Sequence, residues 1–112
     1  MYLIYYHLWM SKKYDNRCPV GRTINAIGDG WSVLILRDLF LNGACKFQDF
    51  QESLPKIVPS TLSARLKRLE SDNLIEREVY EEHPIRVQYK LTEKGKSLGP
   101  VMFALKKWGE EN

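Results

Sequence analysis

The stretch from Val58 to Tyr80, VPSTLSARLKRLESDNLIEREVY, carries most of the side chains whose types and spacing suggest chemistry. Leu62, Leu66 and Leu69 recur at helical spacing and form one apolar stripe. When this stripe faces a protein core, the other residues of the helix turn outward: Ser60, Thr61, Ser63, Ala64, Arg65, Lys67 and Arg68. Small residues let a helix enter a DNA major groove, hydroxyls donate to bases or phosphates, and arginines bind guanine or phosphate bidentately. This helix is therefore a candidate for reading a DNA duplex.

The positive charge of the chain is concentrated around this helix. The sequence has 17 Lys and Arg against 14 Asp and Glu, a formal net charge of +3. Between Lys56 and Ser71 four cations stand against one anion, so this segment accounts for the whole excess. A charged helix exterior is commonly no more than a solvated face, so the helix alone leaves both interpretations open. The elements next to this helix are needed to distinguish a DNA-binding face from a solvated one.

Two cysteines are the other reactive groups. Cys18 directly precedes Pro19 at the expected start of a helix, and Arg17 and Arg22 flank it. A helix N-terminus and neighbouring cations both favour a thiolate, so Cys18 is a candidate redox or electrophile sensor. The alternative is a small residue that packs without reacting. Cys45 is expected to be an ordinary half-exposed residue, and the Cys and His residues lack the paired spacing of zinc ligands, so no metal or other cofactor is expected.

Helices are expected to position these groups. Pro19 and the apolar residues that follow predict a first helix, which Gly28 ends. We expect further helices over 31–42, closed by Gly43; over 47–54, closed by Pro55; and over 60–72, with Ser60 as N-cap and a left-handed Asn73 at its end. The second helix is apolar nearly all round, from Trp31 to Leu41, which predicts a central helix buried on most sides.

Two strands are expected after the basic helix. Residues 75–80 and 87–91 have strand-like patterns, and the segment EEHPIR between them is too long for a two-residue turn, so we expect a projecting loop. Arg86, with His83 second, is the candidate for insertion into a DNA minor groove. Thr92 is expected to cap a last helix, in which Pro100 predicts either a kink or a later true start. This order of elements predicts a mainly α chain with a small β-hairpin, an α+β fold of the winged helix-turn-helix type.

The length of 112 residues suits one domain, which we expect over residues 18–112, after an apolar arm and hinge over residues 1–17. The arm opens with MYLIYYHLWM, and ten residues fall short of the roughly 20 that span a bilayer. It also lacks the cations of a surface membrane helix, so no membrane partner is expected. Packing against the body or a second copy is favoured over a disordered or artificial tail. Without a disulfide framework or a secretory signal, the chain is expected in the reducing cytoplasm.

Three segments taken together resemble a known family: CPVGRTINAIGDGWSVLILRDL, KFQDFQESLPKIVPSTLSARLKRLESDNLIEREVY and HPIRVQYKLTEKGKSLGPVMFALKKWGEE. They are similar to the HxlR-type winged helix-turn-helix transcription regulators, over about Cys18 to Glu111. The resemblance implies a cytoplasmic, homodimeric DNA-binding regulator whose first and last helices form much of the dimer interface. It also implies a recognition helix at Ser60 to Asp72, a wing around Glu81 to Arg86 and, as in some members, a sensing cysteine in the CP position of Cys18.

The chain departs from the family pattern at three places. Gly30 stands where the family commonly has a lysine, which puts a phosphate contact at the head of the second helix in doubt. Cys45 lies in a link that the family often fills with a basic residue. The apolar arm before Asn16 lies outside the pattern, so the resemblance implies nothing about it.

A dimer is also expected from the energetics of DNA binding. A single reading helix buries too little surface for tight specific binding, whereas two rigidly joined copies read two half-sites about 34 Å apart. The expected partner is therefore a near-palindromic double-stranded DNA operator. The apolar residues expected at the dimer interface are Tyr2, Ile4, Leu8 and Trp9 of the arm, Val20 and Ile24 of the first helix, and Leu98, Val101, Met102, Leu105 and Trp108 of the last. The alternative is that they only complete the core of a monomer.

The sequence offers no catalytic motif. It has no Gly-rich phosphate loop, nucleophile elbow or metal motif, so no enzymatic activity is expected. A winged helix that binds protein partners is the alternative to a DNA-binding regulator. Binding to DNA through several cations weakens steeply as salt rises, which separates the two functions. Nothing in the sequence identifies a small-molecule effector.

Overall fold

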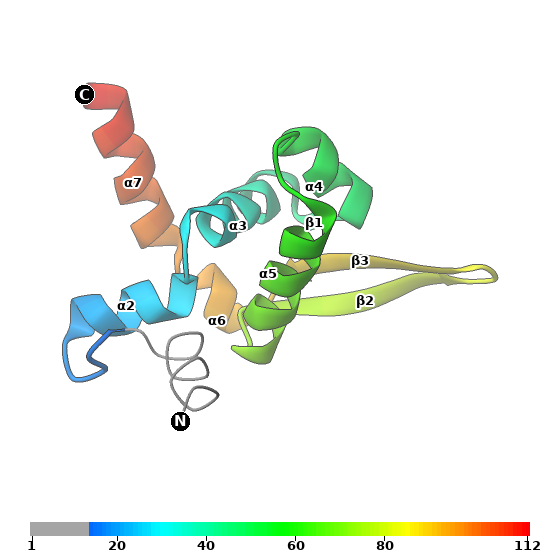
Figure 1. The fold of residues 1–112 in the computed structure, drawn as a ribbon, viewed down its shortest axis with the longest axis horizontal. Coiled ribbons are helices and arrows are strands. Elements are labelled where there is room, and N and C mark those ends of the chain that lie inside the picture. The colour runs from blue at the N-terminus through cyan, green and yellow to red at the C-terminus, as the bar shows by residue number, and fades with distance from the viewer. Residues whose placement is uncertain (1–13) are drawn as a thin grey trace.

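The computed structural model describes residues 14–112, in which a body of helices carries a projecting hairpin (Figure 1). The elements in chain order are α2 (Pro19–Ile27), α3 (Gly30–Asn42), β1 (Ala44–Cys45), α4 (Phe47–Ser53), α5 (Pro59–Ser71), β2 (Ile75–Glu82), β3 (Ile85–Leu91), α6 (Glu93–Lys96) and α7 (Gly99–Glu111). The arm residues Tyr2, Ile4, Leu8 and Trp9 lie outside the described residues.

Helices α2 and α3 begin and end close to where the sequence signals predict. Pro19 lies in the first turn of α2, and Gly28 ends it with a φ of 82°, a backbone angle that favours glycine. Asp29 then caps α3, because its Oδ1 accepts a hydrogen bond of 2.9 Å from the backbone N–H of Ser32. Gly43, with a φ of 81°, closes α3. These boundaries depend only on residues within a turn of each helix end.

Helix α3 forms one wall of the core. Its side chains Ile35, Leu36 and Leu39 are buried against α5 and the sheet. The expectation that α3 is buried on most sides is wrong for one flank, because Leu41 is 74% exposed. Leu41 lines an open groove between α3 and α7. The apolar residues of α3 therefore face the core on one side of the helix and the open groove on the other.

Helices α4 and α5 form the helix-turn-helix pair. Helix α5 begins at Pro59, and Val58 occupies the N-cap position, so the expectation that Ser60 is the cap is wrong. Proline has no backbone donor to leave unpaired, and its fixed φ suits the first turn of a helix, so the helix starts one residue earlier. The three leucines of the expected stripe are buried: Leu62, Leu66 and Leu69. The inward stripe is thus confirmed.

The sheet has three antiparallel strands in the order β1–β3–β2, one strand more than the sequence suggests. The short β1 pairs with β3, which places Cys45 opposite Tyr89. Cys45 is fully buried as a result, so the expectation of a half-exposed residue is wrong. A strand of two residues has no alternation of polar and apolar side chains, so no pattern in the sequence indicates it.

Strands β2 and β3 reach further than expected, and only His83 and Pro84 separate them. The projecting loop expected over 81–86 is therefore wrong. After a register shift between Val79 and Glu81, pairing resumes with Glu81 opposite Arg86, and opposite charges in such a cross-strand pair favour the ladder. The result is a long, narrow hairpin that extends away from the helical body (Figure 1).

Two helices replace the single last helix of the sequence interpretation. Thr92 caps α6 as expected, because its hydroxyl accepts a hydrogen bond of 3.0 Å from the backbone N–H of Gly95. Helix α7 then begins at Gly99, with Pro100 in its first turn. Of the two alternatives for Pro100, the later true start is correct, and α7 needs no kink. Helix α7 contains no buried residue and extends outward from the body (Figure 1).

The core lies between α3, α4, α5 and the sheet, and it holds the basic helix in place. Together the helices and the small antiparallel sheet form a winged helix-turn-helix, an α+β fold in which the β2–β3 hairpin is the wing. Within residues 14–112, every helix is too short or too polar to cross a membrane.

Candidate nucleic-acid interface

Helix α5 presents two different flanks, and the residues expected to contact DNA divide between them. Ser60, Ser63, Ala64 and Lys67 are exposed. Lys67 makes no ion pair with any of residues 14–112, so its charge is free to meet a phosphate. The remaining three of the expected set recur at i, i+4 and i+7 and are half-buried: Thr61, Arg65 and Arg68. This second flank faces the corner between α2 and α3.

Arg65 is held at that corner by Asp29. The guanidinium Nε of Arg65 lies 2.6 Å from Asp29 Oδ2, and the two side chains are 29% and 38% exposed. Partial burial on its own raises the pKa of Asp29. The hydrogen bonds from the backbone N–H of Ser32 and from Arg65 outweigh it, so the pKa of Asp29 lies below its ordinary value. The carboxyl of Asp29 is therefore ionised at neutral pH.

Arg68 is tied to the same corner. Its Nη2 donates to the backbone carbonyl of Asn25 at 3.1 Å, and its Nε donates to Asp72 at 3.4 Å. Asn25 is itself buried, and its side chain exchanges two hydrogen bonds with the backbone of Tyr14. The sequence interpretation missed both Asp29 and Asn25. Asp29 could have been found from the sequence, because an Asp directly before a predicted helix is a typical N-cap. No sequence pattern indicates the contacts of Asn25.

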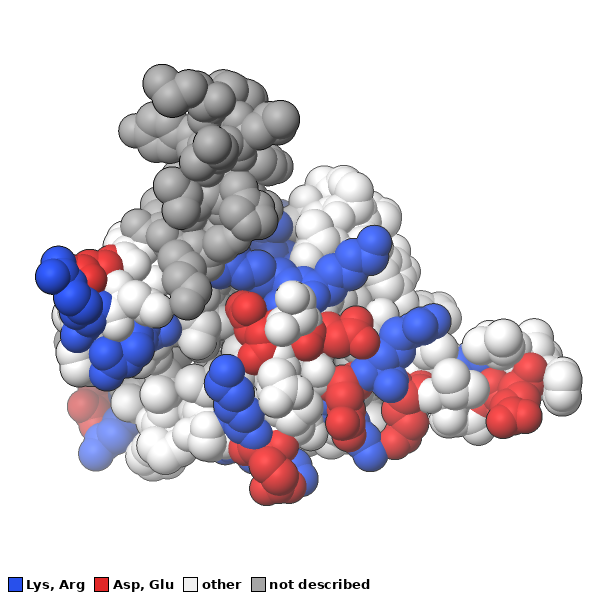
Figure 2. Space-filling model, turned by 90° about the horizontal axis from the view of Figure 1, so that it is seen from below, with Lys and Arg blue, Asp and Glu red and all other residues white. Residues whose placement is uncertain are grey.

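The candidate minor-groove residues of the wing lie among acidic side chains. Arg86 Nε lies 3.0 Å from Glu81 Oε2, so its charge is paired, and His83 is exposed at the turn. Glu82 is exposed beside them. Figure 2 shows acidic side chains near the hairpin tip and basic and acidic side chains interleaved over the face viewed. A contact between Arg86 and DNA therefore requires Arg86 to leave Glu81.

Two further lysines lie near α5 and the wing. Lys56 is exposed in the turn between α4 and α5. Lys46, at the start of α4, places its Nζ 5.1 Å from the ring centroid of Tyr80, a cation–π contact at the wing. Both add exposed positive charge beyond α5.

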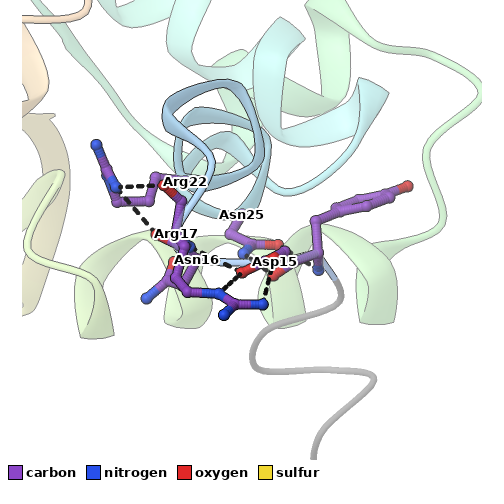
Figure 3. A network of polar contacts seen from close by, with 6 residues as sticks. Asp15, Asn16, Arg17, Arg22 and Asn25 are labelled. Atoms are coloured by element: carbon purple, nitrogen blue, oxygen red, sulfur yellow. Dashed lines mark hydrogen bonds and ion pairs between the residues drawn. The ribbon is translucent and has the colours of Figure 1, made fainter.

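Cys18 is exposed in the N-cap position of α2, but the two arginines beside it have other partners. Arg17 pairs with Asp15 at 3.2 Å, and Arg22 Nη1 donates to the carbonyls of Asn16 and Arg17 at 3.0 and 3.4 Å (Figure 3). Of the two features expected around Cys18, the structure retains the helix N-terminus.

Cys45 has the opposite setting. Burial raises the pKa of its thiol, and its Sγ lies 3.7 Å from the carbonyl of Asp38, to which it donates. A buried thiol with a raised pKa reacts slowly. Within residues 14–112, no three Cys, His, Asp or Glu side chains are arranged to hold a metal ion.

The apolar residues expected at a dimer interface also divide. Leu98 and Met102 pack against the core of their own chain, and Val101 is half-buried. Four others are exposed: Val20 and Ile24 on α2, and Leu105 and Trp108 on α7. Helices α2 and α7 lie on the side of the molecule opposite the wing (Figure 1).

An apolar groove of about 510 Å³ separates α3 from α7. Leu34, Phe40, Met102 and Phe103 line it, with Arg37 and Lys106 among its polar residues. It leaves the inner side of α7 incompletely covered by its own chain.

Comparisons with known proteins agree with this architecture. Residues 26–112 match the family described as HxlR-like helix-turn-helix. YdeP of Bacillus subtilis, an uncharacterized HTH-type transcriptional regulator, is 42% identical over 94 residues, which cover 84% of this chain and 73% of YdeP. An uncharacterized HTH-type transcriptional regulator of Methanothermobacter thermautotrophicus is 45% identical over 93 residues, which cover 83% of this chain and 70% of the relative.

Solved structures share the fold. The redox regulator HypR in its oxidized form superposes with a TM-score of 0.79 at 37% identity, covering 85% of this chain and 97% of HypR. The reduced form of the transcriptional regulator YodB from B. subtilis gives a TM-score of 0.71 at 35% identity, covering 84% of this chain and 92% of YodB. From its helix-turn-helix, its wing and these matches, the chain belongs to the HxlR-like helix-turn-helix family of transcriptional regulators.

Proposed function

We propose that this regulator binds DNA sequence-specifically as a homodimer, with α5 in the major groove and the wing over the adjacent minor groove. The observation that carries the proposal is the exposed flank of α5. Ser60, Ser63, Ala64 and Lys67 are exposed together on a helix whose opposite side is anchored in the core. Hydroxyls, a methyl group and an unpaired lysine on a rigid helix are suited to base edges and phosphates.

A homodimer is proposed because α7 has so little contact with its own chain. Trp108 is 69% exposed and Leu105 is exposed beside it, on a helix with no buried residue. Large apolar side chains grouped on a projecting helix are typical of a subunit interface. Val20 and Ile24 of α2 extend the same apolar surface in the proposal. Two copies joined there present two α5 helices to a near-palindromic operator.

The experiment that tests this function is selection of bound fragments from a random double-stranded DNA pool with the purified protein. We expect enrichment of a near-palindrome whose half-sites are about 34 Å apart, one helical turn. Affinity for the enriched fragment is expected to fall steeply as salt rises, because several cations displace counterions. If no sequence is enriched, or if the affinity for DNA does not change with salt concentration, the proposal is contradicted. A winged helix that binds protein partners is then favoured.

Cys18 is proposed as the sensor of an oxidant or electrophile. Its thiol is exposed at a helix N-terminus, and HypR, whose fold this chain shares, is described as a redox regulator. Cys45 provides an internal control because it is buried.

The sensor proposal predicts a reactivity difference between the two thiols. Peptide mapping after timed alkylation of the folded protein is expected to show Cys18 modified well before Cys45 and faster than free cysteine at the same pH. Peroxide treatment is expected to change operator affinity in the parent but not in Cys18→Ser. Equal alkylation rates for Cys18 and free cysteine, with peroxide leaving affinity unchanged, contradict a sensing role.

A further inference from the structure

The Arg65–Asp29 pair leaves one end of the Arg65 guanidinium available. Asp29 contacts Nε of Arg65, and the two terminal amino groups make no hydrogen bond within residues 14–112. Arg68 differs, because both its Nε and its Nη2 are hydrogen-bonded to the protein. The two arginines of α5 are therefore not equivalent, although the sequence presents them as one basic face.

Asp29 is itself rigidly placed. Its Oδ1 accepts the hydrogen bond from the Ser32 N–H that caps α3, so only Oδ2 points to α5. Gly28, with its positive φ, sets the tight corner just before it. The carboxylate is thus fixed by the α2–α3 corner and not by the helix that it supports.

We propose that Asp29 is a positioning residue for DNA recognition, which holds Arg65 by its Nε so that the two terminal amino groups are presented together to a guanine. This inference rests on the proposed DNA-binding function. The terminal amino groups of an arginine form a planar fork that matches the O6 and N7 acceptors of guanine. Holding Nε restricts a long side chain before binding, so less side-chain entropy is lost when the fork engages a base.

The same carboxylate also disfavours contacts with the wrong part of DNA. Asp29 carries a negative charge next to Arg65, so the pair adds little net positive charge for phosphates, and the carboxylate repels them. A phosphate contact requires only charge, whereas a guanine contact requires the geometry of the fork. Asp29 is therefore expected to raise specificity more than affinity.

The test uses Asp29→Ser, because serine keeps a good N-cap for α3 but removes the carboxylate that binds Arg65. The probes are the operator fragment enriched by the parent protein and a series with each base pair replaced in turn. In the parent, we expect replacement of one guanine in each half-site to weaken binding by about tenfold or more. Asp29→Ser is expected to abolish that discrimination while non-specific affinity stays equal or rises.

Arg65→Lys provides the second arm, because lysine keeps the charge but lacks the fork. It is expected to lose discrimination at the same guanine, and Asp29→Ser combined with Arg65→Lys is expected to add no further loss. Asp72→Ser is the matched control, since it removes a carboxylate paired with the other arginine of α5. It is expected to leave the base preferences unchanged.

The outcomes separate this inference from the function on which it rests. If the parent enriches an operator but Asp29→Ser keeps full discrimination at every base pair, Asp29 is not a positioning residue. If Asp29→Ser binds the operator more tightly with its discrimination intact, Asp29 restrains Arg65 and does not present it, which also overturns the inference. If the parent enriches no sequence, the proposed function and this inference fail together.

Discussion

At the residue scale, the two arginines of α5 are hydrogen-bonded to the corner between α2 and α3. Asp29 and Asn25 bind the two arginines of α5 through one carboxylate and one backbone carbonyl. Hydrogen bonds to charged groups contribute more than neutral ones when they are partly shielded from water. The corner therefore stabilises the fold as well as arranging the proposed interface.

The lowered pKa of Asp29 predicts a specific dependence of stability on pH. Because the pKa is lower in the folded protein than the ordinary value of 3.8, ionised Asp29 stabilises the fold above that value, and this stabilisation is lost as pH falls through the folded pKa. Asp29→Asn keeps a capping oxygen but cannot ionise. We expect it to be less stable than the parent at pH 7, and the difference to shrink as the pH is lowered from 7 to 3, measured by urea denaturation. A difference in unfolding free energy that stays constant between the two pH values contradicts this account.

At the element scale, the short α6 packs through Gly95 against the segment between α5 and β2. A Cβ added at Gly95 would collide with the backbone carbonyl oxygen of Leu74 and approach Leu91 Cδ2 to 3.1 Å. The neighbouring atoms cannot move away cheaply, because the carbonyl belongs to the main chain where α5 leads into β2. The position of α6, and of the chain that leads to α7, depends on this close approach.

Gly95→Ala is therefore expected to destabilise the protein by ~1–3 kcal/mol, as overpacking of a filled site does. Gly30→Ala is the matched control, since nothing lies within 4 Å of a Cβ added there, and it is expected to be neutral or slightly stabilising. Thermal and urea unfolding of both variants check the difference. Equal stability of the two variants would mean that α6 is not docked as described.

At the scale of the whole molecule, the wing and α7 extend from opposite sides of the body (Figure 1). The wing accompanies the exposed flank of α5, and α7 carries apolar residues that its own chain covers only in part. This separation allows one surface to bind DNA while the other joins two copies. It is the arrangement that a rigid dimer on a two-fold symmetric operator requires.

Trp108→Glu is expected to convert the proposed dimer to a monomer at micromolar concentration, because a charge is costly in an apolar interface. Sedimentation velocity measures the change, and operator affinity is expected to fall with it. Val79→Glu is the control for the sedimentation measurement alone, as it adds the same charge at an exposed apolar residue far from α7, on the wing. A parent protein that sediments as a monomer, or a Trp108→Glu variant that remains a dimer, excludes α7 as the interface.

By itself the sequence determined the local features of this protein. Gly28 and Gly43 end α2 and α3, the leucine stripe of α5 faces inward, and Asn73 adopts a left-handed φ of 62°, all as predicted. Each depends on residues within a turn or two of one another, where spacing and residue type carry the information. Family membership followed from the same local patterns taken together.

Only the tertiary structure decided which outward residues are free. Arg65 and Asp29 lie 36 residues apart in sequence, and β1 is too short to show any pattern before it pairs with β3. Such contacts depend on how whole helices and strands pack. The half-buried Arg65 and the exposed Lys67 belong to the same predicted face of one helix, and only the packing distinguishes them. The division of the basic face into a free lysine and two held arginines is therefore a property of the packed molecule.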